Sequence, residues 1–333
     1  TGATSGATAD VVHATGNIFG GEILLENISG AFQSGEQIQV DGLNYVTSSN
    51  LGNPAIAVAK IDGAWTGAES SSIDINGWTT GPRNYVRIYT TSTARHDGKW
   101  SDTAYRIESG NQWVLMSSVA HTRFEGLQVE SLWGAAFSPA GAIYQGYTTG
   151  GGTIIEENIV RYGNSGDYGS GISVATNTGN PPPIIRNNTV YGFDGVNAVC
   201  MYGEGDTAYF VNNTLYGCST GFRGHWAQGQ VAMNNLVQDS SIIDFDSSFS
   251  ASSSNNISSD STAPGSNSLT NTTVEFVDAD NDDYHISVDD QYALDTGTDL
   301  SSDSNLAFST DIDGETRLDG SWDIAGVRKD RET

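Results

Sequence analysis

Short apolar segments alternate with polar and glycine-rich stretches along most of the 333-residue chain. The segments are rich in β-branched residues, and Gly, Asn, Ser and Asp separate them without any helical period. This pattern predicts short strands joined by turns, and therefore an all-β protein.

A polar motif recurs within the pattern, as NNTVYG at residues 187–192 and NNTLYG at residues 212–217. The second residue of each Asn pair defines a frame, into which Gly126 also fits one turn earlier. Its members are Asn158, Asn188, Asn213, Asn235 and Asn256. Repeats of roughly 20 to 50 residues are typical of solenoids, in which each unit stacks on the next.

A parallel coil explains the motif physically. Successive turns would stack about 4.8 Å apart, with Asn at a tight corner, because Asn tolerates a left-handed backbone and its amide can bond to its equivalent on the next turn. Aliphatic side chains at one phase would fill the bore, and the candidates are Ile155, Ile159, Ile185, Val190, Val211, Leu215 and Leu236.

The segments IIRNNTVYG, FVNNTLYG and AMNNLVQ resemble the repeats of right-handed parallel β-helix proteins of the pectate-lyase-like superfamily. The resemblance implies a right-handed, single-stranded parallel β-helix. The C-terminal DYHISVDDQYALDTGTDL and DIDGETRLDGSWDIAGV are similar to the closing segment of extracellular and viral β-helix proteins. GEILLENISGAFQSGEQIQV resembles a small β module of phage structural proteins.

Three parts are expected from this organisation. Residues 1–50 form an N-terminal β module or cap, residues 51–275 form the coil, and residues 276–333 form a C-terminal capping segment. Capping is expected because an uncovered last turn exposes unpaired backbone and invites end-to-end association.

Composition and charge restrict the kinds of partner that the protein can bind. A net charge of −26 disfavours nucleic-acid binding, and no stretch is apolar over the roughly 18 residues that a membrane span needs. Asp outnumbers Glu, and only 3 Lys accompany 11 Arg, which fits either a high-salt adaptation or an ordinary acidic extracellular or viral protein.

Two cysteines, Cys200 and Cys218, are interpreted as buried small hydrophobes, although their pairing is left open. Sequons begin at Asn27, Asn187, Asn212, Asn256 and Asn271, and several of these arise from the repeat itself.

In the pectate-lyase-like superfamily, which the repeats resemble, enzymes use side chains that point outward from one sheet. Aligning the strands after each corner places Ile172, Ala198, Phe222 and Ile242 inward. The outward set would be Ser173, Val199, Arg223, Ile243, Ala175, Met201, His225 and Phe245. This partly apolar stripe suggests a partner surface, and the alternative is a phase error of one residue, which exchanges the faces.

The candidate catalytic residues are Arg223, His225, Tyr202 and Glu204, if the protein is an enzyme. A polysaccharide lyase needs a base beside a uronate carboxylate, and a cation that neutralises that carboxylate. The candidate ligand-binding residues are Trp226, Asp206, Asp167 and Asp194, with Trp226 stacking on a sugar ring and the aspartates as possible glycosidase carboxylates. Solvated surface residues are the competing interpretation throughout.

Alternating acids at Asp278, Asp280 and Asp282 suggest a calcium loop, but the usual Gly and distal Glu are missing. Calcium is accordingly a weak candidate cofactor.

The favoured function is a non-catalytic β-helix protein of a virion or cell surface, which binds a host glycan or receptor or serves as structural decoration. Its expected partners are a surface polysaccharide or glycoprotein, and copies of itself in a trimer, a larger oligomer or a virion assembly. The alternative is a secreted or spike-borne polysaccharide lyase or glycoside hydrolase acting on an acidic polysaccharide.

Overall fold

The computed structural model describes residues 6–17, 20–29, 37–40, 43–47, 56–134, 141–146, 151–164, 166–225, 229–246, 248–317 and 322–325. Two compact units divide the chain, Thr1–Ile56 and Ala57–Thr333. The first contains two antiparallel pairs, β1 (Thr8–Asn17) with β2 (Gly20–Ser29) and β3 (Gln37–Val40) with β4 (Leu43–Thr47). The three-part division predicted above stays a prediction.

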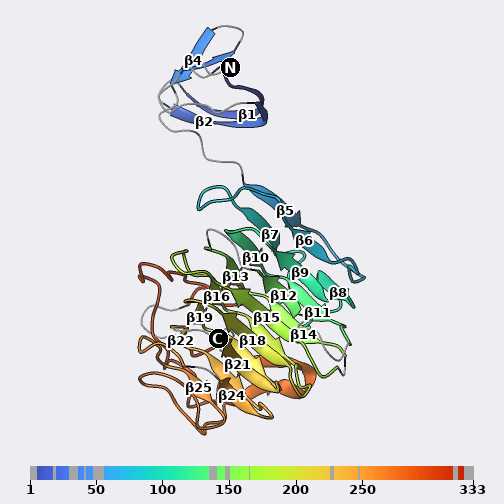
Figure 1. The fold of residues 1–333 in the computed structure, drawn as a ribbon, viewed down its shortest axis with the longest axis vertical. Coiled ribbons are helices and arrows are strands. Elements are labelled where there is room, and N and C mark those ends of the chain that lie inside the picture. Colours follow the sequence, from blue (N-terminus) through green and yellow to red (C-terminus); the bar gives the residue numbers. More distant parts are fainter. Residues whose placement is uncertain are drawn as a thin grey trace. The chain divides into compact units, whose positions relative to one another are not determined.

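The second unit is a right-handed parallel β-helix with three seven-stranded sheets (Figure 1). The first sheet contains β5 (Ala57–Ile61), β7 (Val86–Thr90), β10 (Thr122–Glu125), β13 (Ile154–Glu156), β16 (Ile184–Arg186), β19 (Tyr209–Val211) and β22 (Val231–Met233). The second contains β8 (Arg106–Ser109), β11 (Gln128–Ser131), β14 (Ile159–Tyr162), β17 (Thr189–Tyr191), β20 (Thr214–Tyr216), β23 (Leu236–Gln238) and β25 (Ile257–Ser258). The third contains β6 (Ile73–Ile75), β9 (Trp113–Ser117), β12 (Gly141–Gln145), β15 (Ser170–Ala175), β18 (Val199–Glu204), β21 (Thr220–His225) and β24 (Ile243–Asp246). From β7 to β24, successive strands visit the three sheets in that order, so the predicted coil is confirmed.

The two residues of each Asn pair have different roles at the corner between the first and second sheets. The first residue adopts a positive φ, 51° at Asn187 and 52° at Asn212. The second residue is fully buried and forms a ladder: Asn188 donates from its backbone N and from Nδ2 to Asn213 Oδ1, at 3.1 and 3.0 Å. The same pattern joins Asn158 to Asn188, Asn213 to Asn235, and Asn235 to Asn256.

Gly126 takes the first position of this corner rather than the second. Its φ is 70°, while Leu127 occupies the ladder position and donates its backbone N to Asn158 Oδ1 at 2.9 Å. The predicted frame was therefore one residue off at this turn.

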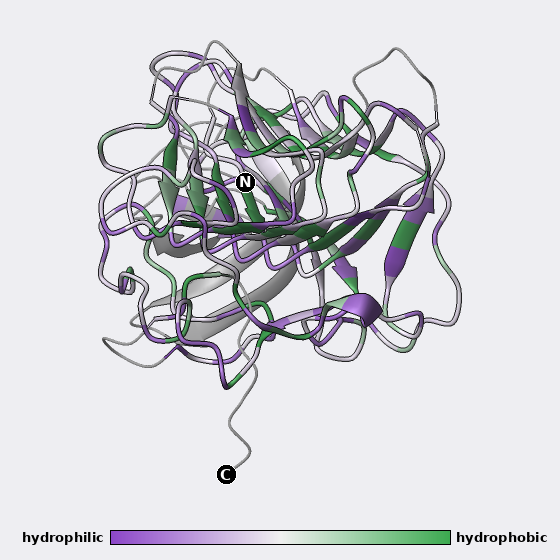
Figure 2. Cartoon of the chain, turned by 90° about the horizontal axis from the view of Figure 1, so that it is seen from below, coloured by the Kyte–Doolittle hydropathy of each residue, from purple (hydrophilic) through white to green (hydrophobic). Residues whose placement is uncertain are grey.

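Apolar side chains fill the bore in register, and Figure 2 shows hydrophobic residues gathered along the strands that surround the interior. Of the predicted bore residues, Ile155, Ile185, Val190 and Leu215 belong to this core. Ile159, Val211 and Leu236 do not, because strand alternation turns them outward. Val160, Phe210 and Val237 fill the bore at those turns instead.

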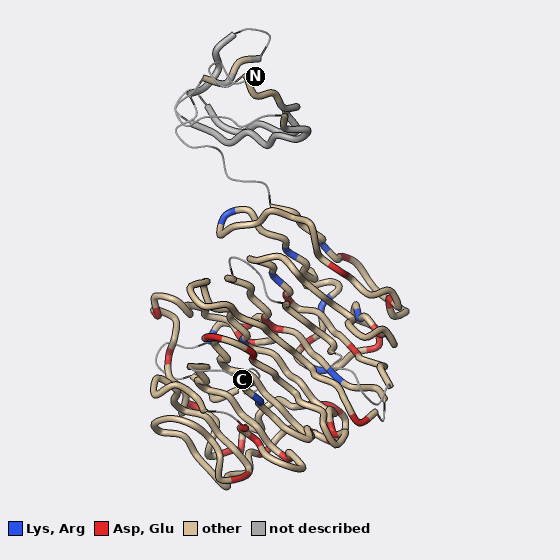
Figure 3. The backbone as a smooth tube through the Cα atoms, in the orientation of Figure 1, with Lys and Arg blue, Asp and Glu red and all other residues tan. Residues whose placement is uncertain are grey.

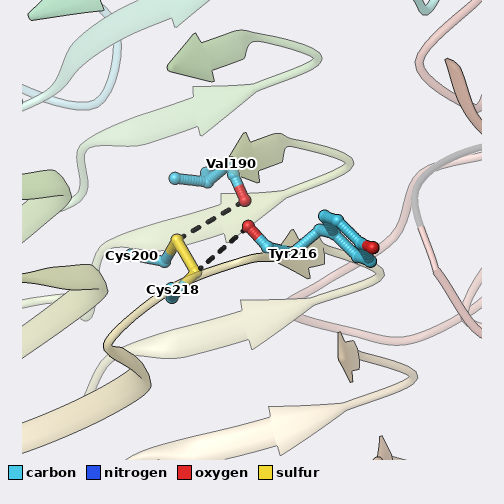
Figure 4. The surroundings of a disulfide bond; sticks show 4 residues. All are labelled: Val190, Cys200, Tyr216 and Cys218. Atoms are coloured by element: carbon cyan, nitrogen blue, oxygen red, sulfur yellow. Dashed lines mark hydrogen bonds between the residues drawn. A yellow bond between two sulfur atoms is a disulfide. The ribbon is translucent and has the colours of Figure 1, made fainter. Parts of the chain in front are cut away.

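Cys200 and Cys218 form a disulfide, with Cα atoms 5.9 Å apart (Figure 4). The two sulfurs lie 3.5 and 3.6 Å from the carbonyl oxygens of Val190 and Tyr216. Both side chains are buried, as predicted, and the disulfide answers the question of pairing that the sequence left open. Sequence could not decide this, because the separation of 18 residues became a contact only through the stacking of turns.

We expect the native chain to take up no iodoacetamide when denatured without a reductant, as read by intact mass. Replacing both cysteines by serine should lower the free energy of unfolding by about 3 kcal/mol, because the crosslink restricts the unfolded chain. Two alkylated thiols in the unreduced protein would contradict the pairing.

The C-terminal segment lies along the flank of the coil rather than only across its end. It contains β26 (Phe276–Asp278), the 3-10 turn Ala279–Asn281 and β27 (Asp283–Ile286). Tyr284 and Ile312 pack on outward residues of the second sheet, Ile159 and Tyr191. Trp322, Leu300 and Leu306 pack on Val211 of the first sheet. Later turns of these two sheets are thus covered by the chain itself.

A buried histidine links two parts of the C-terminal segment, and it lies beside an early loop of the coil. His285 Nδ1 lies 2.5 Å from Asp283 Oδ1, and its Nε2 lies 3.0 Å from Asp313 Oδ2. Burial lowers the pKa of His285, but the two carboxylates outweigh it and raise the pKa to about 8. The neighbouring His96 is buried, and burial together with Arg95 lowers its pKa to about 3.

Stability should therefore fall as pH rises from about 6.5 to 8.5. Because the folded pKa of His285 exceeds its unfolded value, its contribution is complete below the unfolded pKa and is lost above the folded one, about 2 kcal/mol in all. Urea unfolding across this range should show that slope in the native protein and not in His285→Gln. Equal slopes in the two proteins would contradict a charged His285.

Candidate binding face on the third sheet

Register defines the two faces of the third sheet. One column points into the bore and contains Ile73, Leu115, Ile143, Ile172, Met201, Phe222 and Phe245. The next column points outward and contains Asp74, Met116, Tyr144, Ser173, Tyr202, Arg223 and Asp246. The outward column is thus mostly polar and aromatic.

The predicted apolar outer stripe is wrong. Met201 and Phe245 fill the bore, Val199 is 4% exposed, and Ile242, predicted inward, is 61% exposed. The partners of Ile172 and Phe222 are Met201 and Phe245, three residues later than the aligned Ala198 and Ile242. An odd shift exchanges the two faces, as it does at Ile242, and loops of variable length before β18 and β24 caused the shift. Ala198 is nevertheless buried in the core, as predicted. The inward phase of Ile172 and Phe222 is confirmed.

Adjacent strands bring the four candidate catalytic residues together. Tyr202 pairs in register with Arg223, and Glu204 with His225, on β18 and β21. His225 is described by its backbone alone, and Trp226 lies outside the described residues. No catalytic role follows from this adjacency.

Charge on this face is already partly compensated. Arg223 Nε lies 3.2 Å from Asp246 Oδ2, and its Nη2 donates to Thr220 Oγ1 at 3.0 Å. Burial, followed by the nearby Glu204, raises the pKa of Tyr202 to about 12. Tyr202 is therefore a neutral hydrogen-bonding phenol at physiological pH rather than a phenolate base.

An aromatic platform continues the face toward earlier turns. The rings of Trp113 and Tyr144 are stacked, with centroids 4.2 Å apart and planes 24° apart. Both side chains are partly exposed, and Tyr144 precedes Ser173 and Tyr202 in the outward column. Sequence reasoning missed this pair, because it considered only the strands after the Asn repeats.

A small, partly open depression of about 10 Å³, roughly the space that one water molecule needs, lies where the strands of this face end. Its lining includes Ala175, Thr176, Asn177 and Asn180, with Gln145 from the preceding turn. Thr176 donates its backbone N to Glu204 O at 2.8 Å, which ties the lining to the strand that carries Tyr202. Platform and depression thus belong to neighbouring turns.

The remaining ligand-binding candidates lie elsewhere on the turns. Asp167 and Asp194 are exposed on adjacent loops, and both contribute to the raised pKa of Tyr162 after its burial. The Asn197 backbone N donates to Asp167 O at 2.8 Å, so the two loops touch as expected. Asp206 follows β18 in the turn after Glu204, and its backbone carbonyl accepts from Gln230 at 2.7 Å.

The three aspartates of the proposed calcium loop are engaged in part with protein groups. Asp278 accepts from Asn281 at 2.8 Å, and Asp282 lies 3.5 Å from Arg161. Among the residues that the structure describes, no group of three or more His, Cys, Asp or Glu side chains is placed to hold a metal ion. Calcium at Asp278, Asp280 and Asp282 gains no support.

The sequons of the repeat are used structurally. Asn187, Asn212 and Asn256 are at most 1% exposed, and each donates from its side chain to backbone carbonyls. Asn271 is exposed. The buried three are inaccessible to glycosylation in the folded coil.

No protein-family model matches the chain, and neither a curated protein nor a solved structure matches it. Within the described residues, no helix has the length and apolar character to cross a bilayer. What the fold establishes is a parallel β-helix, while the narrower likeness to pectate-lyase-like proteins rests on the repeat motifs.

Proposed function

We propose that this protein is a non-catalytic glycan-binding β-helix of a cell or virion surface, and that it binds sugars on the outer face of the third sheet. The observation that carries the proposal is the stack of Trp113 on Tyr144, because Tyr144 lies in the same outward column as Tyr202. Exposed aromatic rings on a rigid sheet offer flat apolar surfaces with polar edges, which suits the alternating apolar and hydroxyl faces of sugars.

Coverage of the other sheets supports the choice of face. The C-terminal segment packs on outward residues of the first and second sheets over the later turns. Among the residues that the structure describes, the outward column of the third sheet takes no part in those clusters. It therefore offers a surface several turns long that the described part of the segment leaves uncovered.

The charges favour an uncharged glycan over an acidic one. Arg223 is paired with Asp246, while Glu204 lies on the same face and the whole chain carries −26. A polyanion would meet repulsion from that field. An extracellular or virion location is supported by the disulfide, because such bonds persist in oxidising compartments.

A glycan array followed by calorimetry tests the proposal. Tyr144→Ala and Tyr202→Ala should each weaken binding at least about tenfold, because losing one well-packed aromatic contact removes about 1.5 kcal/mol or more. Tyr292→Ala is the matched control, since Tyr292 is 49% exposed on the C-terminal segment. Equal affinity in all four proteins would contradict the proposed face.

The enzymatic alternative keeps a specific basis, the adjacency of Tyr202, Glu204 and Arg223. Uronate polysaccharides incubated with the protein should give no absorbance at 232 nm, the mark of an elimination product, and no reducing ends should be released from neutral polysaccharides. Turnover that Arg223→Lys abolishes would replace the binding proposal with a lyase or hydrolase.

A further inference from the structure

Positive charge is concentrated in the first turns of this acidic coil. Residues 57–134 contain seven of the 14 Lys and Arg residues with eight Asp and Glu, whereas residues 135–333 contain the other seven with 27 acids. Figure 3 shows the same contrast between the early and later turns. The first turns are nearly neutral, and an anion meets least repulsion there.

Within this region, the guanidinium of one arginine stacks on an aromatic ring. Arg123 lies opposite Arg87 in the outward column of β10 and β7, and its guanidinium lies 4.0 Å from the ring centroid of Tyr85. Arg123 is partly exposed. Stacking orients the planar guanidinium and leaves the donors at its edge available to a ligand.

Most other arginines of the described coil have a carboxylate within hydrogen-bond distance. These are Arg87 with Glu125, Arg95 with Glu157, Arg106 with Glu108, Arg161 with Glu130, Arg186 with Glu156, and Arg223 with Asp246. Within the part of the coil that the structure describes, Arg123 and Arg83 make no such pair. Arg83 is exposed two residues before Tyr85. In a chain with 40 acids, a guanidinium that stacks on a tyrosine and has no carboxylate partner among the described residues is unusual.

Two further side chains complete the surroundings. His121 lies beside Arg123 in sequence, and burial followed by Arg123 lowers its pKa, so that its ring is neutral at physiological pH. Arg87 is neutralised by Glu125 and stacks at 4.1 Å on Tyr89. The net positive charge is therefore located on Arg123, with Arg83 near in sequence.

We propose that Arg123 on Tyr85, flanked by His121, is a binding site for an oxyanion group, a sulfate or carboxylate carried by a ligand. A guanidinium edge donates two parallel hydrogen bonds to such a group. The site lies on the first sheet and does not depend on the glycan proposed for the third.

Arginine-selective NMR of the full chain, labelled at Nε, tests the site with inorganic sulfate as the probe. Chloride replaces sulfate at constant ionic strength, and acetate forms a second titration that distinguishes carboxylate from sulfate. One Nε–H resonance should shift and saturate with sulfate, and it should be absent from Arg123→Gln. Arg106→Gln is the matched control, because Arg106 is paired with Glu108 on the second sheet.

Tyr85→Leu is a second variant, in case Arg123→Gln does not fold. It keeps the charge of Arg123 and removes the ring on which the guanidinium stacks. It should weaken sulfate binding about three- to tenfold, in line with the worth of a cation–π contact. A shift that does not saturate, or that persists in Arg123→Gln, would overturn the site. A resonance shifted equally by chloride would do so as well.

Discussion

Met201→Asn should destabilise the coil by about 4–6 kcal/mol, whereas Tyr202→Asn, one residue along, should cost about 1 kcal/mol. Met201 is fully buried between Ile172 and Phe222 of the adjacent strands. The substitution removes a large apolar side chain and buries an amide without partners, costing about 2–5 and 1–3 kcal/mol. Tyr202 faces outward and is only partly buried, so its replacement should cost about as much as an average point mutation, about 1 kcal/mol.

Denaturation in urea, followed by tryptophan fluorescence, measures both variants. The comparison is matched because the replacement is identical and the two residues are neighbours in β18. Equal losses, or a greater loss at Tyr202, would mean that the two faces have been assigned the wrong way round.

Asn213→Ala should lower the free energy of unfolding by about 4 kcal/mol, although the chain retains its strands. The side chain of Asn213 donates to Ile185 O at 2.9 Å and to Asn235 Oδ1 at 3.0 Å, and it accepts two bonds from Asn188. Alanine leaves these buried groups short of partners, which costs about 1–3 kcal/mol for each group left unsatisfied.

The melting temperature should fall by about 10 °C in this variant, given about 2–4 °C per kcal/mol for a domain of this size. Asn305→Ala is the control, since Asn305 is exposed in the C-terminal segment and its backbone N, which alanine keeps, donates to Asp303 Oδ1. A change at Asn213 no larger than that at Asn305 would show that the ladder contributes little.

The architecture was predictable because its signal repeats. Each Asn pair fulfils both demands of a corner, a left-handed residue and a buried amide, and few residues meet them together. Stacking then places Asn158, Asn188 and Asn213 in contact although 25 to 30 residues separate them. Fold class and coil corners thus follow from local chemistry repeated at intervals.

The faces were harder to predict, because phase depends on where each strand begins. Loops absorb extra residues without altering the stack, so the aligned Ala198 and Ile242 missed their true register by three residues. Ile159 and Leu236 looked like bore residues because they are aliphatic, yet they are buried by the C-terminal segment from outside. A hydrophobic residue on an outward position signals such a cover, and sequence alone does not say what supplies it.

The candidate site was likewise predictable only in part. Tyr202, Glu204, Arg223 and His225 were named from sequence, and adjacent strands do place them side by side. Trp113 and Tyr144 precede the Asn repeats, so no motif pointed to them, and only the register joins Tyr144 to the later turns. The disulfide was missed for a related reason, since it links positions that stacking brings together.

Hydrogen exchange of the full chain, with and without the glycan that binds it best on an array, tests the proposed face most directly. Peptides covering β12, β15, β18 and β21 should exchange more slowly with the glycan bound, and those covering β26 and β27 should be unchanged. Protection confined to the first sheet or to the C-terminal segment, or no protection at saturating glycan, would contradict a binding face on the third sheet.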